Sequence, residues 1–343
     1  MAQLSDEETT NGNLPTLPFD VLPEILCRLP VKLLVQLRCL CKFFHSLISD
    51  PTFAKKHLHF STNCHHLMVS SRNNLGELVH GDSPITSVFS TSIITQTQLC
   101  PPNSITLGDN YAFPLCSCDG IFCCVVLNVD SLFLWNPSIR KVKLLPPLEG
   151  ALFNISFGYD HFIDNYKVIV VSENNEVSVN TLGTDYWRRI EDIPYDYYIG
   201  LYGIFVSGTV NWLASNDSNI LSLDLNTESY QRLLLPDSKN YLWALGVLRD
   251  CLCVFASGDM FLDIWIMKEY GNIVLDHIVQ RSCSYHGSVC PYLKAVYISK
   301  NDQVLVQFPN CSWLFMIPEK LFSRFLRFNT PMVGRAQKSA LRV

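Results

Sequence analysis

The sequence predicts an α+β, multidomain protein in which a small N-terminal unit of three helices precedes an all-β, propeller-like domain. Three observations predict this fold class. Apolar residues recur at helical spacing between residues 17 and 53, and short segments rich in β-branched and aromatic residues follow from residue 66. Some of these segments also repeat along the chain. We expect residues 1–16, which are polar and lack periodicity, to form a disordered leader.

The composition limits the class of protein. A chain of 343 residues can form two domains, and 48% hydrophobic with 17% charged residues is typical of a well-packed globular protein. The net charge of −5 gives no reason to expect nucleic acid or an anionic membrane as a partner. The acidic, polar N-terminus resembles neither a secretory signal nor a transit peptide. We therefore expect a cytoplasmic or nuclear protein.

The fourteen cysteines lie mostly inside apolar runs, as in GIFCCVVL and LRDCLCVF. Buried free cysteine behaves as a small hydrophobic residue, and a reducing compartment keeps it in that form. Because C-x-x-C pairs at zinc-site spacing are absent from the sequence, we expect no metal and no cofactor.

The N-terminal helices can be placed from their apolar spacing. The first run, Leu22 to Leu29, follows an expected helix start at Asp20, whose carboxylate can cap the unpaired N–H groups, and Pro30 ends it. Two further runs cover 32–41 and 43–48, and 54–59 continues as a short helix. Three helices in under 40 residues cannot bury all of their apolar surface, so the unit should present a partner-binding patch.

This stretch resembles the F-box, the helical module that docks a substrate adaptor onto the Skp-type subunit of a cullin ubiquitin ligase. The matching residues are Leu17-Pro18, Asp20, Glu24-Ile25-Leu26, Arg28-Leu29-Pro30-Val31-Lys32, Leu34, Arg38, Cys41-Lys42, Leu47-Ile48, Asp50-Pro51 and Phe53. A helical bundle that docks nothing is the alternative, and the Leu-Pro start and the Arg-Leu-Pro-Val-Lys segment argue against it. The resemblance implies that the adaptor contacts are made by Leu17, Pro18, Ile25, Leu26, Leu29, Pro30 and Leu34.

One residue departs from the F-box pattern. Phe44 stands where the plant version usually has tryptophan. Because both are large aromatic residues in a buried role, we expect a smaller contact in an intact fold.

The β-rich part contains a repeated unit of two strands around a turn with Asn or Asp, closing on Leu or Ile and Pro. The three copies begin at Leu132 (LFLWNPSIRKVKLLPP), Val177 (VSVNTLGTDYWRRIEDIP) and Ile220 (ILSLDLNTESYQRLLLP). Their spacing of about 45 residues is typical of propeller blades, four-stranded sheets that bury their faces by stacking on neighbours. The repeat therefore favours a propeller over a sandwich or barrel.

The same region resembles the plant F-box-associated domain, which is related to kelch-type propellers. The likeness rests on Ser117–Gly120, Trp135–Arg140, Phe157–Asp160, Tyr166–Val168, Trp187–Ile190, Gly208–Leu213, Asp224-Leu225 and Asp263–Gly271. We assign 17–60 to the F-box and 65–318 to this domain. The likeness fades after Gly271. Residues 320–343 carry six basic and no acidic residues, so we expect 319–343 to be a disordered or atypical tail that leaves the last blade unclosed.

The sequence contains no catalytic motif, such as G-x-S-x-G, H-E-x-x-H or a P-loop, so we expect no catalytic residues. Four tryptophans at 135, 187, 212 and 265 lie within strand-like segments and are interpreted as core residues. If a target is bound, loops rich in aromatic residues are the expected place. The candidates are Tyr195, Tyr197, Tyr198, Tyr202, Tyr241 and Trp243.

Together the two resemblances imply a non-catalytic, substrate-recognition adaptor subunit of an SCF-type ubiquitin ligase. Its partners would be a Skp-type adaptor, a cullin bound through that adaptor, and an unidentified target protein, with no nucleic acid and no membrane. A kelch-like enzyme or small-ligand sensor that uses the propeller channel is the alternative. An F-box protein that binds partners without promoting their degradation is another.

Overall fold

The structure is a computed structural model that describes residues 21–61, 65–72, 78–90, 93–94, 96–100, 112–126, 131–148, 152–194, 199–200, 203–214, 219–235, 242–257, 261–269, 272–282, 294–299, 304–307, 313–317, 320–328 and 340–342. The chain divides into two compact units, Met1–Asn63 and Cys64–Val343. The first is helical and the second is built of β-sheets. The predicted fold class is therefore confirmed.

The helical unit consists of α1 (Val21–Leu26), α2 (Val31–Arg38), α3 (Lys42–Ser49) and α4 (Pro51–Ser61). The three predicted runs correspond to α1–α3, and α4 is longer than the helix expected at 54–59. Its core consists of Leu26, Cys27, Leu34 and Phe53. Phe44 is half-buried against this core, as its aromatic side chain predicts.

The second unit contains six sheets among its described residues. The first two are β25 (Ala340–Arg342), β1 (His66–Arg72), β2 (Leu78–Pro84) and β4 (Thr97–Leu99), then β5 (Ala112–Cys118), β6 (Ile121–Val126), β7 (Ser131–Asn136) and β8 (Lys141–Leu144). The next two are β9 (Leu152–Asp160), β10 (Asn165–Ser172), β11 (Val177–Thr181) and β12 (Arg188–Arg189), then β13 (Ile204–Val206), β14 (Thr209–Ala214), β15 (Asn219–Asp224) and β16 (Tyr230–Leu234).

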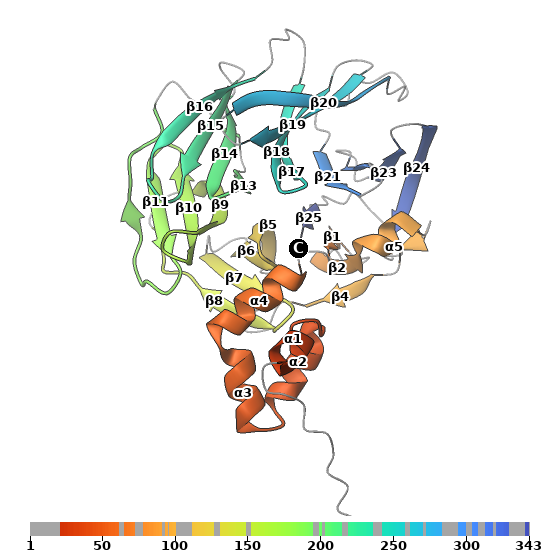
Figure 1. The fold of residues 1–343 in the computed structure, drawn as a ribbon. Coiled ribbons are helices and arrows are strands. Elements are labelled where there is room, and N and C mark those ends of the chain that lie inside the picture. The colour runs from red at the N-terminus through yellow and green to blue at the C-terminus, as the bar shows by residue number, and fades with distance from the viewer. Residues whose placement is uncertain are drawn as a thin grey trace, which may run out of the picture. The chain divides into compact units, whose positions relative to one another are not determined.

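The last two sheets are β17 (Leu242–Leu248), β18 (Cys251–Ser257), β19 (Phe261–Glu269) and β20 (Asn272–Ser282), then β21 (Lys294–Ile298), β22 (Val304–Gln307), β23 (Trp313–Ile317), β24 (Lys320–Phe328) and β3 (Ile93–Ile94). A short helix, α5 (Ile85–Ser90), follows β2. The first strand of each sheet contacts the first strand of the next, in the order β25, β5, β9, β13, β17, β21 and back to β25. The sheets are therefore the blades of a closed ring (Figure 1).

The predicted repeat is confirmed. The repeats that begin at Leu132, Val177 and Ile220 start in β7, β11 and β15, the third strands of three consecutive blades. Each repeat is thus the outer hairpin of its blade. A two-strand repeat was visible in the sequence because its turn residues and alternating apolar positions are local.

Strands from both ends of the β unit close the ring. β25 pairs antiparallel with β1, with Leu67 opposite Arg342 and Val69 opposite Ala340. β3 pairs parallel with β24, with Arg327 opposite Ile93. The expectation of an unclosed last blade is therefore wrong, and the part of 319–343 outside 320–328 and 340–342 lies outside the described residues. Pairing between β25 and β1 satisfies backbone hydrogen-bonding groups at the edge of β1. Local sequence cannot predict this pairing, because the two strands lie about 270 residues apart in the chain.

The tryptophans fill the spaces between blades, as predicted. Trp135 is 2% exposed and Trp212 is fully buried. The Trp212 Nε1 donates to Asn154 Oδ1 at 2.9 Å, and the Trp187 Nε1 donates to the Pro146 carbonyl at 2.9 Å. Trp212 thus buries its ring completely, and the half-buried Trp187, like Trp212, satisfies its single donor.

A buried histidine joins the first two blades. His80 on β2 is 2% exposed, its Nδ1 lies 2.8 Å from the Ser70 hydroxyl, and its ring centroid lies 5.9 Å from that of Trp135 on β7. A hydrogen bond also links it to the backbone of Ala112 on β5. Burial lowers the pKa of His80 to about 4, so the ring is neutral at pH 7.

This neutral histidine should make the protein sensitive to acid. In the unfolded chain the imidazole takes up a proton near its ordinary pKa of 6.5, whereas in the folded chain it does so only near 4. The unfolded state therefore binds more protons between these values, and stability falls as pH drops through this window, by roughly 3 kcal/mol in total. Urea unfolding at pH 7 and pH 4.5 should show a smaller loss for His80→Gln than for the wild type. Equal losses would contradict this assignment.

The closing strand should contribute to the stability of the whole ring. A chain that lacks residues 340–343 leaves the inner edge of β1 unpaired. We expect its thermal midpoint to fall by about 4 °C or more, since each kcal/mol corresponds to roughly 2–4 °C in a domain of this size. Scanning calorimetry of this variant beside one that lacks only Val343 tests the expectation. Identical midpoints would show that β25 does not hold the ring closed.

Candidate functional site

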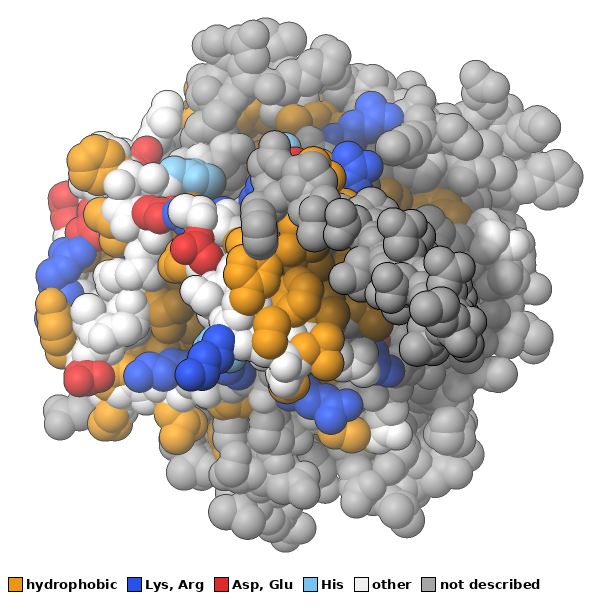
Figure 2. Space-filling view, turned by 60° about the horizontal axis from the view of Figure 1, so that its bottom comes forward, with side chains coloured by type: hydrophobic (Ala, Val, Ile, Leu, Met, Phe, Trp, Pro, Cys, Tyr) orange, Lys and Arg blue, Asp and Glu red, His pale blue; other side chains and the backbone are white. Residues whose placement is uncertain are grey.

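The helical unit exposes several large apolar side chains to solvent. In its described part, seven large apolar side chains are 36–70% exposed: Val21, Ile25, Leu33, Val35, Leu40, Phe43 and Phe60. We call this set the helical apolar surface. Figure 2 shows hydrophobic side chains gathered near the centre of the view, with lysine or arginine at the edges. A group of exposed apolar side chains on a unit this small indicates a partner site.

The residues predicted to bind the adaptor fall into two groups in the structure. Ile25 is 43% exposed and Pro30 is also exposed, so both are accessible to a partner. Leu26 and Leu34 are 3% and 4% exposed in the core of the unit, and Leu29 is half-buried against it. The buried leucines can position the helices, but in this conformation they offer a partner little surface. Leu17 and Pro18, like the expected cap Asp20, lie outside the described residues.

Contacts between α4 and residues 24–29 fix the shape of the unit. The His57 Nε2 on α4 lies 2.9 Å from the Leu29 carbonyl oxygen, and Lys56 forms an ion pair with Glu24 on α1. The Arg28 guanidinium lies 5.8 Å from the centre of the Phe60 ring, within reach of a cation–π interaction. These contacts hold α4 against the preceding helices.

The Asp50 carboxylate caps the N-terminus of α4. Asp50 Oδ1 accepts hydrogen bonds from the backbone N–H of Thr52 at 2.8 Å and of Phe53 at 3.3 Å. Hydrogen bonds from Thr52 and Phe53 lower the pKa of Asp50. Beside this cap, an open groove of about 490 Å³ is lined by Pro23, Phe43, Ser46, Leu47, Asp50, Thr52, Phe53 and Lys56.

In the blades β5–β8, β9–β12 and β13–β16, the first-to-second and third-to-fourth turns lie at one end of the ring, because each of these sheets is an antiparallel meander. In three neighbouring blades these turns are at 119–120, 137–140, 161–164, 182–187, 207–208 and 225–229, and we call this end the turn face. Contacts between blades confirm that the turns share one end. The Tyr166 hydroxyl donates to Asp119 at 3.0 Å, and Lys167 reaches the Leu225 carbonyl at 2.5 Å.

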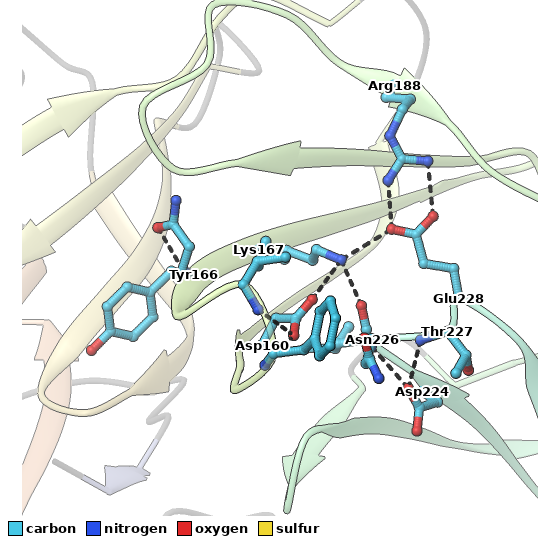
Figure 3. Close-up of polar contacts among 12 residues, drawn as sticks. Asp160, Tyr166, Lys167, Arg188, Asp224, Asn226, Thr227 and Glu228 are labelled. Carbon is cyan, nitrogen blue, oxygen red and sulfur yellow. Dashed lines mark hydrogen bonds and ion pairs between the residues drawn. The ribbon is translucent and has the colours of Figure 1, made fainter.

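A buried ionic network joins two blades at the turn face (Figure 3). The Lys167 ammonium, 5% exposed as a residue, lies 2.8 Å from Asp160 Oδ2 and 3.0 Å from Glu228 Oε1. Arg188 binds Glu228 with both terminal nitrogens, one of them 2.8 Å from Oε2. Burial acts to raise the pKa of Asp160 and Glu228, but bonds from Lys167, and for Glu228 also from Arg188, hold both below their usual values. Both carboxylates therefore stay ionised.

Breaking this network should destabilise the propeller. Lys167→Met would leave Asp160, which is 1% exposed, without its buried cation. Removal of one partner from a buried ion pair costs about 3–5 kcal/mol. Arg188→Gln is the matched control, since the Arg188 side chain is 49% exposed and its loss should cost much less. Guanidinium unfolding measures both variants, and equal effects would contradict a buried role for Lys167.

The aromatic residues predicted to bind a target are mostly outside the described part of the chain. Tyr195, Tyr197, Tyr198, Tyr202 and Tyr241 are not described. Trp243 lies in β17, half-buried in the cluster between two blades, with its ring centroid 5.7 Å from that of Trp265. Its target-binding role stays a prediction. Among the described side chains, we found no group of three or more His, Cys, Asp or Glu placed to hold a metal ion.

The structure also reveals exposed apolar residues that sequence reasoning missed. Phe162 is 79% exposed and Ile163 is 45% exposed in the β9–β10 turn, and Tyr186 is 63% exposed in the β11–β12 turn of the same blade. A signal was present, since two large apolar residues lie between His161 and Asp164 in a segment too short to bury them. Its meaning depended on knowing that this segment is a turn.

Comparison with known families agrees with this architecture. The F-box domain matches residues 14–56, and the F-box associated beta propeller domain matches residues 69–317. This chain belongs to the F-box proteins with an F-box-associated β-propeller domain. Both predicted resemblances are thereby confirmed.

Related F-box proteins occur in Arabidopsis thaliana. F-box/kelch-repeat protein At3g23880 is 28% identical over 329 residues, which cover 88% of each chain. F-box protein CPR1 is 28% identical over 303 residues, covering 75% of this chain and 70% of its own. Putative F-box protein At3g10430 is 31% identical over 242 residues, covering 64% of this chain and 61% of its own. In this F-box protein, no helix of the described residues is long and apolar enough to cross a membrane.

Proposed function

We propose that this F-box protein is the substrate-recognition adaptor subunit of an SCF-type ubiquitin ligase. Its helical unit binds a Skp-type adaptor and, through it, a cullin, while the propeller binds a target protein. The protein itself catalyses nothing. Its contribution is proximity, because holding the target beside the ubiquitin-loaded enzyme raises their effective concentration.

The observation that carries this proposal is the helical apolar surface, all of which except Phe60 lies within residues 14–56, the segment that matches the F-box domain. α1, α2 and α3 are short helices, and they leave side chains such as Leu33 and Phe43 45% exposed, while Leu40 between α2 and α3 is 70% exposed. Covering such side chains with a partner removes apolar area from water, worth about 25 cal/mol per Å². The same family assignment favours an adaptor over an enzyme, and we place its work in the cytoplasm or nucleus.

The predicted adaptor residues have two proposed roles, which depend on whether the side chain is exposed or buried. We propose that Ile25 and Pro30, with Leu17 and Pro18, contact the adaptor directly. Leu26, Leu29 and Leu34 then act mainly by holding α1 and α2 in place. This division distinguishes residues whose substitution weakens binding alone from residues whose substitution also unfolds the unit.

A charge on the helical apolar surface should disrupt docking. Ile25→Asp in the full-length protein places a carboxylate on a side chain that is 43% exposed, so the fold should tolerate it while the adaptor interface does not. We expect binding to a purified Skp-type adaptor to weaken at least tenfold, about 1.4 kcal/mol, in biolayer interferometry. Leu234→Asp, at a propeller side chain that is 55% exposed, is the control and should bind as the wild type does.

Two outcomes of this experiment would count against the proposal. If the wild-type protein fails to bind the adaptor, the docking role is wrong. If the folded Ile25→Asp variant binds with unchanged affinity, docking does not use this surface. Capture of the cullin together with the adaptor, identified by mass spectrometry, would support assembly into the ligase.

A further inference from the structure

The hairpin formed by β7 and β8 concentrates positive charge. Residues 131–148 include Arg140, Lys141 and Lys143 but no acidic residue, although the whole chain has a net charge of −5. All three side chains are exposed. No described residue forms an ion pair or a side-chain hydrogen bond with any of the three. Their charges are therefore available to a partner.

The rest of the blade offers little negative charge. In its described part, Asp119 is the only acidic residue, and its carboxylate accepts the Tyr166 hydroxyl of the next blade at 3.0 Å. The outer strand of that next blade, β12, is different. Its Arg188 and Arg189 both form ion pairs with carboxylates. The cations of β12 are thus balanced within the protein, whereas those of the β7–β8 hairpin are not.

Local hydrogen bonds fix the turn that holds these cations. Asn136 Oδ1 accepts the backbone N–H groups of Ser138 at 3.1 Å and of Ile139 at 3.3 Å. Lys141 and Lys143 follow on β8, two residues apart. Because alternate residues of a strand point to the same side, both lysines lie on one face of β8.

β8 also forms the open edge of its sheet. It is the last strand in the order β5-β6-β7-β8, and among the described strands it pairs only with β7 (Figure 1). The Leu145 N–H donates to the Leu132 carbonyl at 3.0 Å, so residues 141, 143 and 145 direct their backbone groups toward β7. The N–H and C=O groups of Val142 and Leu144 therefore point to the open edge, where another strand can pair with them.

The second face of β8 is apolar. Val142 is half-buried against the cluster that contains Trp135, and Leu144 is 60% exposed. Lysine on an edge strand can serve only to prevent pairing with other chains. An exposed leucine on the same four-residue strand does not fit that purpose, because exposed apolar area favours association.

We propose that β8 and its turn bind an extended acidic segment of a partner protein, which adds to the open edge as a further strand. We call this surface the basic edge, and its residues are Arg140, Lys141, Val142, Lys143 and Leu144. Backbone hydrogen bonds to the edge would supply affinity, and alternating side chains would supply specificity.

The two faces of β8 define the sequence of the segment. Residues opposite each other in an antiparallel pair have side chains on the same face, and opposite charges there attract. The segment should therefore place Asp or Glu opposite Lys141 and Lys143, and apolar residues opposite Val142 and Leu144. A nucleic acid could use the cations, but it has no peptide backbone to pair with the open edge.

The inference that this segment belongs to the ubiquitination target rests on the proposed function. The binding chemistry does not, because it follows from the basic edge alone. The basic edge includes none of the aromatic candidates that were predicted from the sequence.

A displayed library of random dodecapeptides, selected on the full-length protein, tests the proposal. We expect the enriched sequences to contain two Asp or Glu residues separated by one apolar residue. One enriched sequence is then synthesised with a fluorescent label, and its affinity is measured by fluorescence polarisation for the wild type and for the variants below. Binding should weaken as salt is added, because charge attraction at an exposed surface is screened.

The first variant removes the charges. Lys141→Gln with Lys143→Gln should weaken peptide binding about tenfold and reduce its salt dependence, since two cross-strand charge pairs are lost. Arg188→Gln with Arg189→Gln is the matched control. It causes the same change in net charge on the outer strand of the next blade, and it should bind the peptide as the wild type does.

The second variant tests the backbone pairing. Leu144→Pro removes the N–H that points to the open edge and leaves the bonds between β8 and β7 intact. Leu144→Ala is its control, because alanine shortens the side chain but keeps the N–H. We expect proline to weaken the peptide about fivefold more than alanine does, which is the effect of one lost hydrogen bond. Equal effects would show that the segment does not add to the edge.

Thermal unfolding confirms that each variant is folded. The proposal is wrong if no peptide is enriched, if the enriched peptides lack the paired acidic residues, or if the folded lysine variant binds equally well. A labelled DNA duplex is the second probe. If it binds as tightly as the peptide and loses the same affinity in the lysine variant, the surface binds polyanions in general and the proposal is also wrong.

Adaptor binding, measured on the same proteins, distinguishes this failure from failure of the proposed function. Loss of peptide binding with intact adaptor binding in the lysine variant supports both. A wild type that binds the peptide as expected but not the adaptor supports the basic edge and overturns the proposed function.

Discussion

The backbone pairing that closes the ring is the constraint on which the rest of the propeller depends. A blade buries its faces only against its two neighbours, so an open ring would expose apolar surface at both ends of the series. Here β25 completes the blade that begins with β1, and β3 adds to the blade that ends with β24. The first and last blades thus each contain strands from both ends of the β unit, and unfolding one end removes a partner from the other.

The helical unit has too few residues to bury all of its apolar side chains. It has enough apolar residues to build a core around Leu26, Leu34 and Phe53, but its helices are too few to cover the remaining ones. Contacts from α4, including the His57 bond to the Leu29 carbonyl, fix the helices without covering Leu33 or Leu40. A rigid unit with exposed apolar side chains is well suited to binding, because little conformational entropy is lost when the partner docks.

The buried charges of the propeller join neighbouring blades. Lys167, Asp160 and Glu228 are largely withdrawn from water, and together with Arg188 they form a network of two cations and two carboxylates that spans two blades. Asp119 and Asp164 lie at exposed turns and accept hydrogen bonds from the hydroxyls of Tyr166 and Tyr159. Aspartates of the same turn face therefore act through ion pairs where they are buried and through hydrogen bonds to tyrosine where they are exposed.

The sequence by itself determined those features that depend on residues close together in the chain. The helices of residues 21–61, the hairpins at Leu132, Val177 and Ile220, and the core positions of Trp135 and Trp212 all follow from local spacing and turn chemistry. Local spacing does not predict exposure even within a single helix. Ile25 and Leu26 belong to the same predicted apolar run, Leu22 to Leu29, yet the first is 43% exposed and the second 3%.

Only the tertiary structure decided which distant residues meet. It gave the number of sheets in the described chain and paired residue 67 with residue 342. It placed Lys167 against Glu228, 61 residues later, and Tyr166 against Asp119, 47 residues earlier. The physical reason is that strand pairing and ion pairing depend on where a partner lies in space. Turn residues and apolar spacing describe only neighbouring residues, so they do not identify a partner that is distant in the chain.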